Sequence, residues 1–370
     1  MPIASKGLLG LCVALWFLTS AVCTACGKIT LTLLRPHAGS SCALTLTATQ
    51  FAVSAIMSVS IALLLGRRPP AAYREVVLVS LAYTFGFLLL NCSLGRLQAS
   101  FSETVRGLEP LTSFLLAHLL GARGARLSRA SGGALLSVLS GAALSIYSQP
   151  AFDVPGFLYG LLANCAFSSR GLLVTLLQDA TTRVRGGGDG GEKAGSIDPI
   201  GLFAAQHTLG LCILVPAAML VDDRRCAASL AHDPWDNPAT RAAALSALGF
   251  LAYNFLSLLV LLLIDAVSHS VCNTCRRAVT IVAAAFVFQN AISTSSAAGI
   301  LLIIGGSAAY AIASAADRAG THAAPGGQRQ AATAEADALL EVPSDSRSDS
   351  GGEPGERVLV VACGSARPGA

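Results

Sequence analysis

The chain is dominated by apolar blocks of roughly twenty residues that carry few charges. A hydrocarbon core of about 30 Å needs about 20 apolar residues in a helix, which is the length of these blocks. Strand-type alternation is absent, and a backbone in lipid must satisfy its own hydrogen bonds, so helices are expected rather than a barrel. The sequence therefore predicts an all-α integral membrane protein with ten transmembrane helices, at 8–33, 43–65, 76–95, 99–120, 131–148, 154–177, 199–221, 242–264, 266–289 and 291–315.

Composition narrows the class of partner and chemistry. Only 12% of the residues are charged, about half the share typical of soluble domains. The net charge is +4, and no basic segment is interleaved with aromatic residues, so a nucleic-acid partner is not expected. The eleven cysteines lie mostly in apolar blocks, where they act as small hydrophobes, and the two CxxC pairs are far apart. We expect no disulfide framework, metal site or cofactor.

The ten blocks lie in one membrane domain, predicted at 8–316 after a short N-terminal segment, 1–7. The first apolar block imitates a signal peptide, but it continues to Lys28, so we expect a retained span. Residues 182–197 are rich in glycine and charge, and they predict a flexible loop between the sixth and seventh spans. Residues 317–370 shift to a polar composition that predicts a disordered tail.

The basic residues of the connecting segments predict the orientation in the membrane. With a cytoplasmic N-terminus, nine of them lie on the cytoplasmic side and five on the other, so both termini are expected in the cytoplasm. The nine are Arg67, Arg68, Arg74, Arg123, Arg126, Arg129, Arg183, Arg185 and Lys193, and the five are Arg35, Arg96, Arg224, Arg225 and Arg241.

Charged residues inside the predicted spans are costly and mark function by default. Cations exceed anions among them, and an anionic solute would balance this surplus. Arginine suits phosphate or carboxylate because its guanidinium stays charged and donates two parallel hydrogen bonds. The alternatives are a structural pair between Glu109 and Arg106, and snorkelling of Lys28 and Arg170 to the headgroups. The set comprises Lys28, Glu103, Arg106, Glu109, Arg170, Arg276 and Arg277.

Two of these charged segments resemble the triose-phosphate translocator family of the drug/metabolite transporter superfamily. Residues 91–110, NCSLGRLQASFSETVRGLEP, are similar to the family pattern NVSLxxVAVSFTHxIKAxEPFF. Residues 267–277, VSHSVCNTCRR, are similar to VTHxVGNxxKR. Trp16 and Lys28 are similar to the family's W…NKK, and the resemblance covers roughly 10–316. It implies ten helices in two inverted five-helix repeats. A weak echo agrees with this, because 102–106 and 272–276 share a threonine and an arginine.

The resemblance also implies a site. The phosphate-binding cations of the family correspond to Arg106, Arg276 and Arg277, and its tyrosine that contacts the organic part corresponds to Tyr253. Lys28 and Glu103 complete the candidate substrate-binding set. Glu103 stands where the family pattern has histidine. Phe87 and Leu90 stand where plastid members have His and Thr or Ser, so the pocket beside the phosphate is expected to differ.

The predicted function is exchange of a phosphorylated small organic anion for inorganic phosphate by alternating access. The solute class is triose phosphate, phosphoenolpyruvate or sugar phosphate. The alternatives are a nucleotide-sugar/nucleoside-monophosphate antiporter of the same fold and a non-transporting membrane scaffold. An enzyme is not expected, because no catalytic constellation stands out. The sequence leaves the oligomeric state open, and it leaves an endomembrane (Golgi or endoplasmic reticulum) and a plastid-type membrane as candidates.

Overall fold

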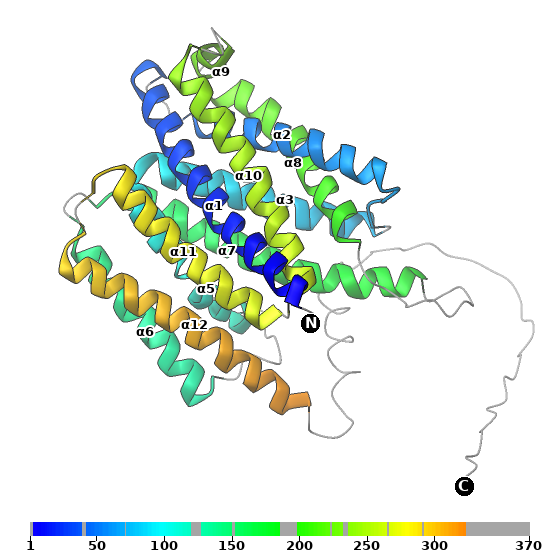
Figure 1. Ribbon diagram of the computed structural model, residues 1–370, viewed down its shortest axis with the longest axis vertical. Coiled ribbons are helices and arrows are strands. Elements are labelled where there is room, and N and C mark those ends of the chain that lie inside the picture. Colours follow the sequence, from blue (N-terminus) through cyan, green and yellow to red (C-terminus); the bar gives the residue numbers. More distant parts are fainter. Residues whose placement is uncertain are drawn as a thin grey trace, which may run out of the picture. The chain divides into compact units, whose positions relative to one another are not determined.

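A computed structural model of the chain describes residues 3–38, 42–70, 72–119, 127–149, 152–185, 198–222, 224–231, 236–264, 266–290 and 292–322. The regular elements of these residues are helices (Figure 1). They are α1 (Ile3–Ala38), α2 (Ala43–Leu64), α3 (Tyr73–Arg96), α4 (Ala99–Arg106), α5 (Glu109–Leu119), α6 (Arg129–Tyr147), α7 (Val154–Arg185), α8 (Pro199–Val221), α9 (Arg224–Ala231), α10 (Pro238–Leu263), α11 (Ala266–Val287) and α12 (Thr294–His322).

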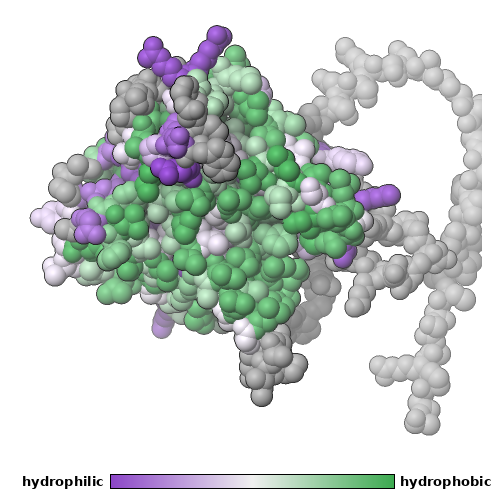
Figure 2. Space-filling model, turned by 45° about the horizontal axis from the view of Figure 1, so that its top comes forward, coloured by the Kyte–Doolittle hydropathy of each residue, from purple (hydrophilic) through white to green (hydrophobic). Residues whose placement is uncertain are grey.

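Nine helices of the described part are long and apolar enough to cross a membrane. The all-α membrane fold expected from the apolar blocks is thus confirmed. Large apolar side chains lie on the outside of the bundle, and Phe286 and Leu64 are 77% and 86% exposed. Apolar residues cover much of the face shown in Figure 2. Such a surface fits lipid contact, since a soluble monomer rarely exposes large apolar patches.

The fourth predicted span is the one that differs from a single long helix. α4 ends at Arg106, a turn follows at Gly107 and Leu108, and α5 begins at Glu109. Pro110 explains the break, because proline has no N–H to donate to the carbonyl of residue 106 and its ring would clash there. In the first turn of α5, by contrast, proline is well tolerated. The expected span at 99–120 is therefore divided into two short helices.

The helices pair in a symmetric way. α1 packs on α10, α2 on α8, α3 on α7 and α6 on α12, while α4 packs on α11. If α4 and α5 count as one span and the short α9 is left out, each half has five spans. The first to fifth spans of one half then correspond in order to those of the other. Under this correspondence the pair α1–α10 becomes α7–α3 and the reverse, and the other pairs map onto themselves. Two repeats of five helices related by a pseudo-two-fold axis give this pattern. We call α1–α6 the first half and α7–α12 the second half.

One end of the bundle carries a disulfide that the sequence did not predict. Cys42, just before α2, is bonded to Cys226 of α9, and the two are 184 residues apart in sequence. At the same end, the Asp222 carboxylate accepts hydrogen bonds from the Thr45 N–H (2.7 Å) and hydroxyl (2.8 Å). The expectation that the cysteines form no disulfide framework is wrong for this pair. Sequence spacing gave no sign of it, because the two cysteines meet only when α2 and α9 come together.

Three helices run clearly further than expected. α1 begins at Ile3, within the predicted N-terminal segment, and ends at Ala38. α7 continues to Arg185, into the segment predicted as a loop, and α12 continues to His322, into the predicted tail. The rest of that loop, 186–197, and the rest of that tail, 323–370, lie outside the described residues.

Candidate functional site

The cavity at the centre of the bundle is lined by helices of both halves. The first half contributes residues of α1 to α4, and the second half contributes residues of α10 and α11. Four of the predicted site residues, Glu103, Arg106, Tyr253 and Arg276, lie in this lining. The complete lining is Ser20, Cys23, Thr24, Gln50, Phe87, Leu90, Asn91, Leu94, Glu103, Arg106, Phe250, Tyr253 and Arg276.

Arg276 of α11 is held from several sides. Its Nε donates to Asn273 Oδ1 at 3.1 Å, and its Nη1 donates to the hydroxyl of Ser20 on α1. Its guanidinium carbon lies 5.6 Å from the centre of the Tyr253 ring and 5.9 Å from that of Trp16. A guanidinium has five N–H groups, so this arrangement fixes the group while donors remain for a ligand.

Arg106 of α4 is buried beside an acid and an aromatic ring. Its Nη1 lies 4.0 Å from Glu103 Oε2, and its guanidinium carbon lies 5.2 Å from the centre of the Phe167 ring. Its Nε is buried and has no hydrogen-bond partner among the described residues. Arg106 and Arg276 thus bring two guanidinium groups to the same cavity from opposite halves.

Arg277 follows Arg276 directly but has a different environment. It forms an ion pair with Glu109 of α5, and its Nη1 donates to the carbonyl of Arg106 at 2.5 Å. That carbonyl is free to accept because Pro110 has no N–H for it. Arg277 lines a second pocket beside the central cavity, together with Thr274, Gly107 and Glu103. Consecutive helical residues point about 100° apart, so the pair is divided between two environments.

Lys28 of α1 lies outside the lining of the central cavity. Its Nζ donates to the carbonyls of Leu94 (2.8 Å) and Leu97 (2.7 Å) at the C-terminal end of α3. A cation at this position interacts favourably with the negative end of the helix dipole. These contacts stabilise the junction between α3 and α4, and this junction positions α4 with Arg106.

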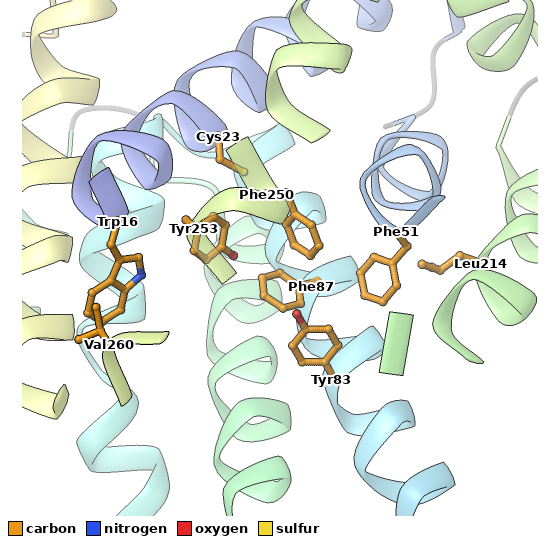
Figure 3. Packing of buried hydrophobic residues seen from close by; sticks show 9 residues of the cluster. All are labelled: Trp16, Cys23, Phe51, Tyr83, Phe87, Leu214, Phe250, Tyr253 and Val260. Atoms are coloured by element: carbon orange, nitrogen blue, oxygen red, sulfur yellow. The ribbon is translucent and has the colours of Figure 1, made fainter. Parts of the chain in front are cut away.

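One part of the cavity wall is aromatic and apolar. The rings of Phe87 and Phe250 meet edge to face with centres 4.7 Å apart, and Tyr253 follows at 5.8 Å from Phe250 (Figure 3). Phe87 and Leu90, the two departures from the resemblance, both lie in the cavity lining. The wall beside the arginines therefore lacks the polar groups expected there in plastid members.

Several cavity residues were not predicted from the sequence. Asn91 donates to Thr47 Oγ1 and Gln50 Oε1, both at 2.9 Å, and Asn91 and Gln50 form a polar part of the cavity wall. On α1, Ser20 and Thr24 recur with Lys28 every four residues, so a polar stripe on one helix face was the available signal.

Arg170, for which snorkelling was an alternative, lies over an aromatic ring inside the bundle. Its guanidinium carbon is 4.7 Å from the centre of the Tyr83 ring. The Tyr83 hydroxyl and His207 Nε2 are 3.2 Å apart. This cluster extends the aromatic wall away from the two arginines of the cavity.

Comparison with known proteins points to transporters. The Triose-phosphate Transporter family matches residues 8–311. The phosphoenolpyruvate/phosphate translocator 1, chloroplastic, of Arabidopsis thaliana is 27% identical over 304 residues, which cover 80% of this chain and 70% of that protein. The triose phosphate/phosphate translocator, non-green plastid, chloroplastic, of Brassica oleracea var. botrytis is 26% identical, covering 80% and 71%. The glucose-6-phosphate/phosphate translocator 2, chloroplastic, of Arabidopsis thaliana is 23% identical, covering 63% and 56%.

Proposed function

Because the chain belongs to the Triose-phosphate Transporter family, we propose that it exchanges a phosphorylated small organic anion for inorganic phosphate across a membrane. The observation that carries this proposal is the convergence of Arg106 and Arg276 on one buried cavity. Two guanidinium groups without full acidic partners suit a phosphate dianion, since each can donate two parallel hydrogen bonds. The relatives named above are phosphate translocators, which supports the same class of solute.

The arrangement of the two halves supports transport by alternating access. The cavity takes Arg106 from the first half and Arg276 from the second, so a bound phosphate bridges them. Rocking one half against the other would open the cavity to one side at a time. Without a bound anion the two cations repel each other, which disfavours the crossing of the empty carrier and couples the two directions of transport.

We assign a separate role to each of these residues. Arg106 and Arg276 bind the phosphate, and Tyr253 contacts the organic part from the facing wall. Lys28 positions the α3–α4 break through its two carbonyl contacts. Arg277 supports Arg106 through its carbonyl and neutralises Glu109, and it reaches the phosphate only if these contacts rearrange.

A reconstituted exchange assay tests the proposal. Purified protein in liposomes should take up labelled phosphate when the liposomes are preloaded with phosphate, and also when they are preloaded with at least one of triose phosphate, phosphoenolpyruvate and glucose 6-phosphate. Liposomes without internal anion should not take it up. Absence of counter-exchange with the whole panel would overturn the proposal. Uptake of a nucleotide sugar against a nucleoside monophosphate, without phosphate exchange, would assign the chain to that transport class instead.

The disulfide bears on the orientation and the membrane. It lies at the end where α1 leads into α2, which is the non-cytoplasmic side when both termini face the cytoplasm. Disulfides persist in oxidising compartments such as the lumen of the endoplasmic reticulum. We therefore infer cytoplasmic termini and an endomembrane location, with α9 on the luminal side.

Labelling of cysteines in intact microsomes tests this inference. Cys42 and Cys226 should react with a membrane-impermeant maleimide only after reduction and only when the vesicles are opened. A terminal tag should be cleaved by protease in sealed vesicles. Reaction of both cysteines without reductant, or a protected tag, would contradict the assignment.

A further inference from the structure

The anion cavity contains an acid. Glu103 lies on α4 one turn before Arg106, is 3% exposed, and lines both the central cavity and the neighbouring pocket. A negative charge beside a phosphate site is unfavourable unless it contributes to binding, because ionised side chains within a bilayer are costly.

The two carboxylate oxygens of Glu103 differ. Oε1 accepts a hydrogen bond from the Thr24 hydroxyl at 3.2 Å. Oε2 is buried without a hydrogen-bond partner among the described residues, and its nearest cation, Arg106 Nη1, is at 4.0 Å. A buried acceptor left without a donor is expensive. The cavity thus holds a carboxylate oxygen that a ligand can satisfy.

The second acid of this region shows the contrast. Glu109 is three residues beyond Arg106, and its carboxylate forms an ion pair with Arg277. Glu109 is therefore occupied by a cation of the protein, whereas Glu103 has an oxygen left over. The charged lining of the central cavity consists of Arg106, Arg276 and Glu103. A phosphate dianion balances the two arginines and leaves the Glu103 charge for the rest of the solute.

We propose that Glu103 determines specificity by selecting phosphorylated solutes whose organic end group is a neutral hydrogen-bond donor and by excluding those whose end group is a carboxylate. A hydroxyl donates to Oε2 and satisfies it. A carboxylate brings a second negative charge close to Glu103, where both charges are shielded from water and repel strongly. The proposal rests on the phosphate exchange proposed above and adds the class of the organic part.

Among the described residues that line the central cavity, Glu103 is the single acid. Phe87 and Leu90 offer no hydrogen bond to the organic part of a solute, and both lie in the same lining. Tyr253 contributes a hydroxyl from the opposite half, but a phenol is neutral. The other neutral polar residues of the lining, Ser20, Thr24, Gln50 and Asn91, carry no charge either. Repulsion of a negative end group therefore depends on Glu103.

A matched pair of solutes tests the inference. Glycerol 3-phosphate and 3-phosphoglycerate differ at one end, where the first has a hydroxyl and the second a carboxylate. Each competes with labelled phosphate in liposomes that contain the full-length protein. For the wild type, the inhibition constant of glycerol 3-phosphate should be at least about tenfold lower than that of 3-phosphoglycerate, which corresponds to about 1.4 kcal/mol. Glu103→Gln keeps the shape of the side chain and removes its charge, so the ratio should fall about tenfold.

Two further variants control the result. Glu103→His introduces the histidine that the family pattern has at this position, and it should also lower the ratio. Glu75→Gln removes a carboxylate from the first turn of α3, outside both pockets, and should leave the ratio unchanged. Phosphate self-exchange and size-exclusion profiles establish that each variant is folded.

The outcomes are distinguishable. If the wild type performs no phosphate exchange, the proposed function fails. If the wild type exchanges phosphate but prefers 3-phosphoglycerate, the inference about Glu103 is overturned whatever the variants do. An unchanged ratio in a Glu103→Gln protein that still exchanges phosphate would also overturn it.

Discussion

The fourth span and α11 carry the arginines to the centre of the bundle in different ways. α4 ends at Arg106, and the chain turns at Gly107 and Leu108 before α5. α11, which packs against α4, is one continuous helix, Ala266–Val287. A break within a helix leaves carbonyls without their usual donors. Here Arg277 donates to the carbonyl of Arg106, and Ser307 of α12 donates to that of Gly107 at 3.0 Å.

This difference shows that the two halves contribute different chemical groups to the site. The broken span supplies acceptors and both acids, Glu103 and Glu109, whereas α11 supplies cations. Of the two adjacent arginines, Arg277 completes the broken span and Arg276 faces the central cavity. The two adjacent arginines thus have unlike surroundings: Arg277 contacts the junction between α4 and α5, and Arg276 lies at the proposed solute site.

The largest effect is expected for Arg276→Gln. The variant loses two charge-assisted hydrogen bonds to phosphate, each worth about 1.5–3 kcal/mol, so phosphate self-exchange should fall at least about 100-fold. The melting temperature should fall less than in Arg277→Gln, because Arg276 forms no ion pair with an acid among the described residues and loses only its contacts with neutral partners such as Ser20 and Asn273. Arg276→Lys keeps the charge but not the paired geometry and should retain part of the activity. Wild-type exchange by Arg276→Gln would remove the proposed division between the two arginines.

Arg277→Gln should act mainly on stability. It leaves the Glu109 carboxylate without its cation and the Arg106 carbonyl without its donor. Breaking a buried ion pair costs about 3–5 kcal/mol, and the Glu109 side chain is 30% exposed, so about 3 kcal/mol is expected. The measurement is thermal unfolding in detergent with and without phosphate.

The double variant Arg277→Gln/Glu109→Gln serves as the control for that prediction. Removal of both charges avoids the unpaired acid, so the double variant should unfold at a higher temperature than Arg277→Gln alone. If the single and double variants have the same unfolding temperature, the ion pair does not stabilise the junction.

The sequence predicted most of this arrangement. Apolar blocks predicted the spans, and the cost of charge in lipid singled out Arg106, Arg276 and the acids near them. The residue types alone did not divide Arg276 from Arg277. That division depends on the direction of each side chain relative to α4, and on a carbonyl that Pro110 leaves free. Pro110 is visible in the sequence, but the sequence does not indicate that Arg277 donates to the Arg106 carbonyl.

Long-range pairs account for what was missed. Cys42 and Cys226 lie in separate connections, and no local pattern links them. Ser20 reaches Arg276 across 256 residues of sequence. Motif reasoning compares residues close together in the chain, so contacts that form only when helices of the two halves meet leave no local signal.

Gly107→Ala tests the broken span itself. Gly107 has φ −62° and ψ −14°, which suit alanine, so any cost comes from crowding rather than backbone strain. An added Cβ would lie 2.3 Å from Ile303 Cγ2 and 3.0 Å from the Thr104 carbonyl oxygen. Overpacking of this kind costs about 1–3 kcal/mol. The matched control is Gly305→Ala on α12, where a Cβ has no neighbour within 4 Å. Equal unfolding temperatures for the two variants would contradict a tight contact between the Gly107 turn and Ile303 of α12.

The smallest effect is expected for Ser307→Ala. The change removes the hydroxyl that donates to the Gly107 carbonyl and leaves the surrounding packing intact. Hydrogen bonds between membrane helices contribute about 0.6 kcal/mol on average, so the unfolding temperature should drop slightly. Ser60→Ala is the control, because the Ser60 hydroxyl bonds within its own helix to the Ile56 carbonyl at 2.8 Å. A drop in Ser307→Ala that exceeds the drop in Gly107→Ala would mean that the free carbonyl, rather than close packing, determines the stability of the broken span.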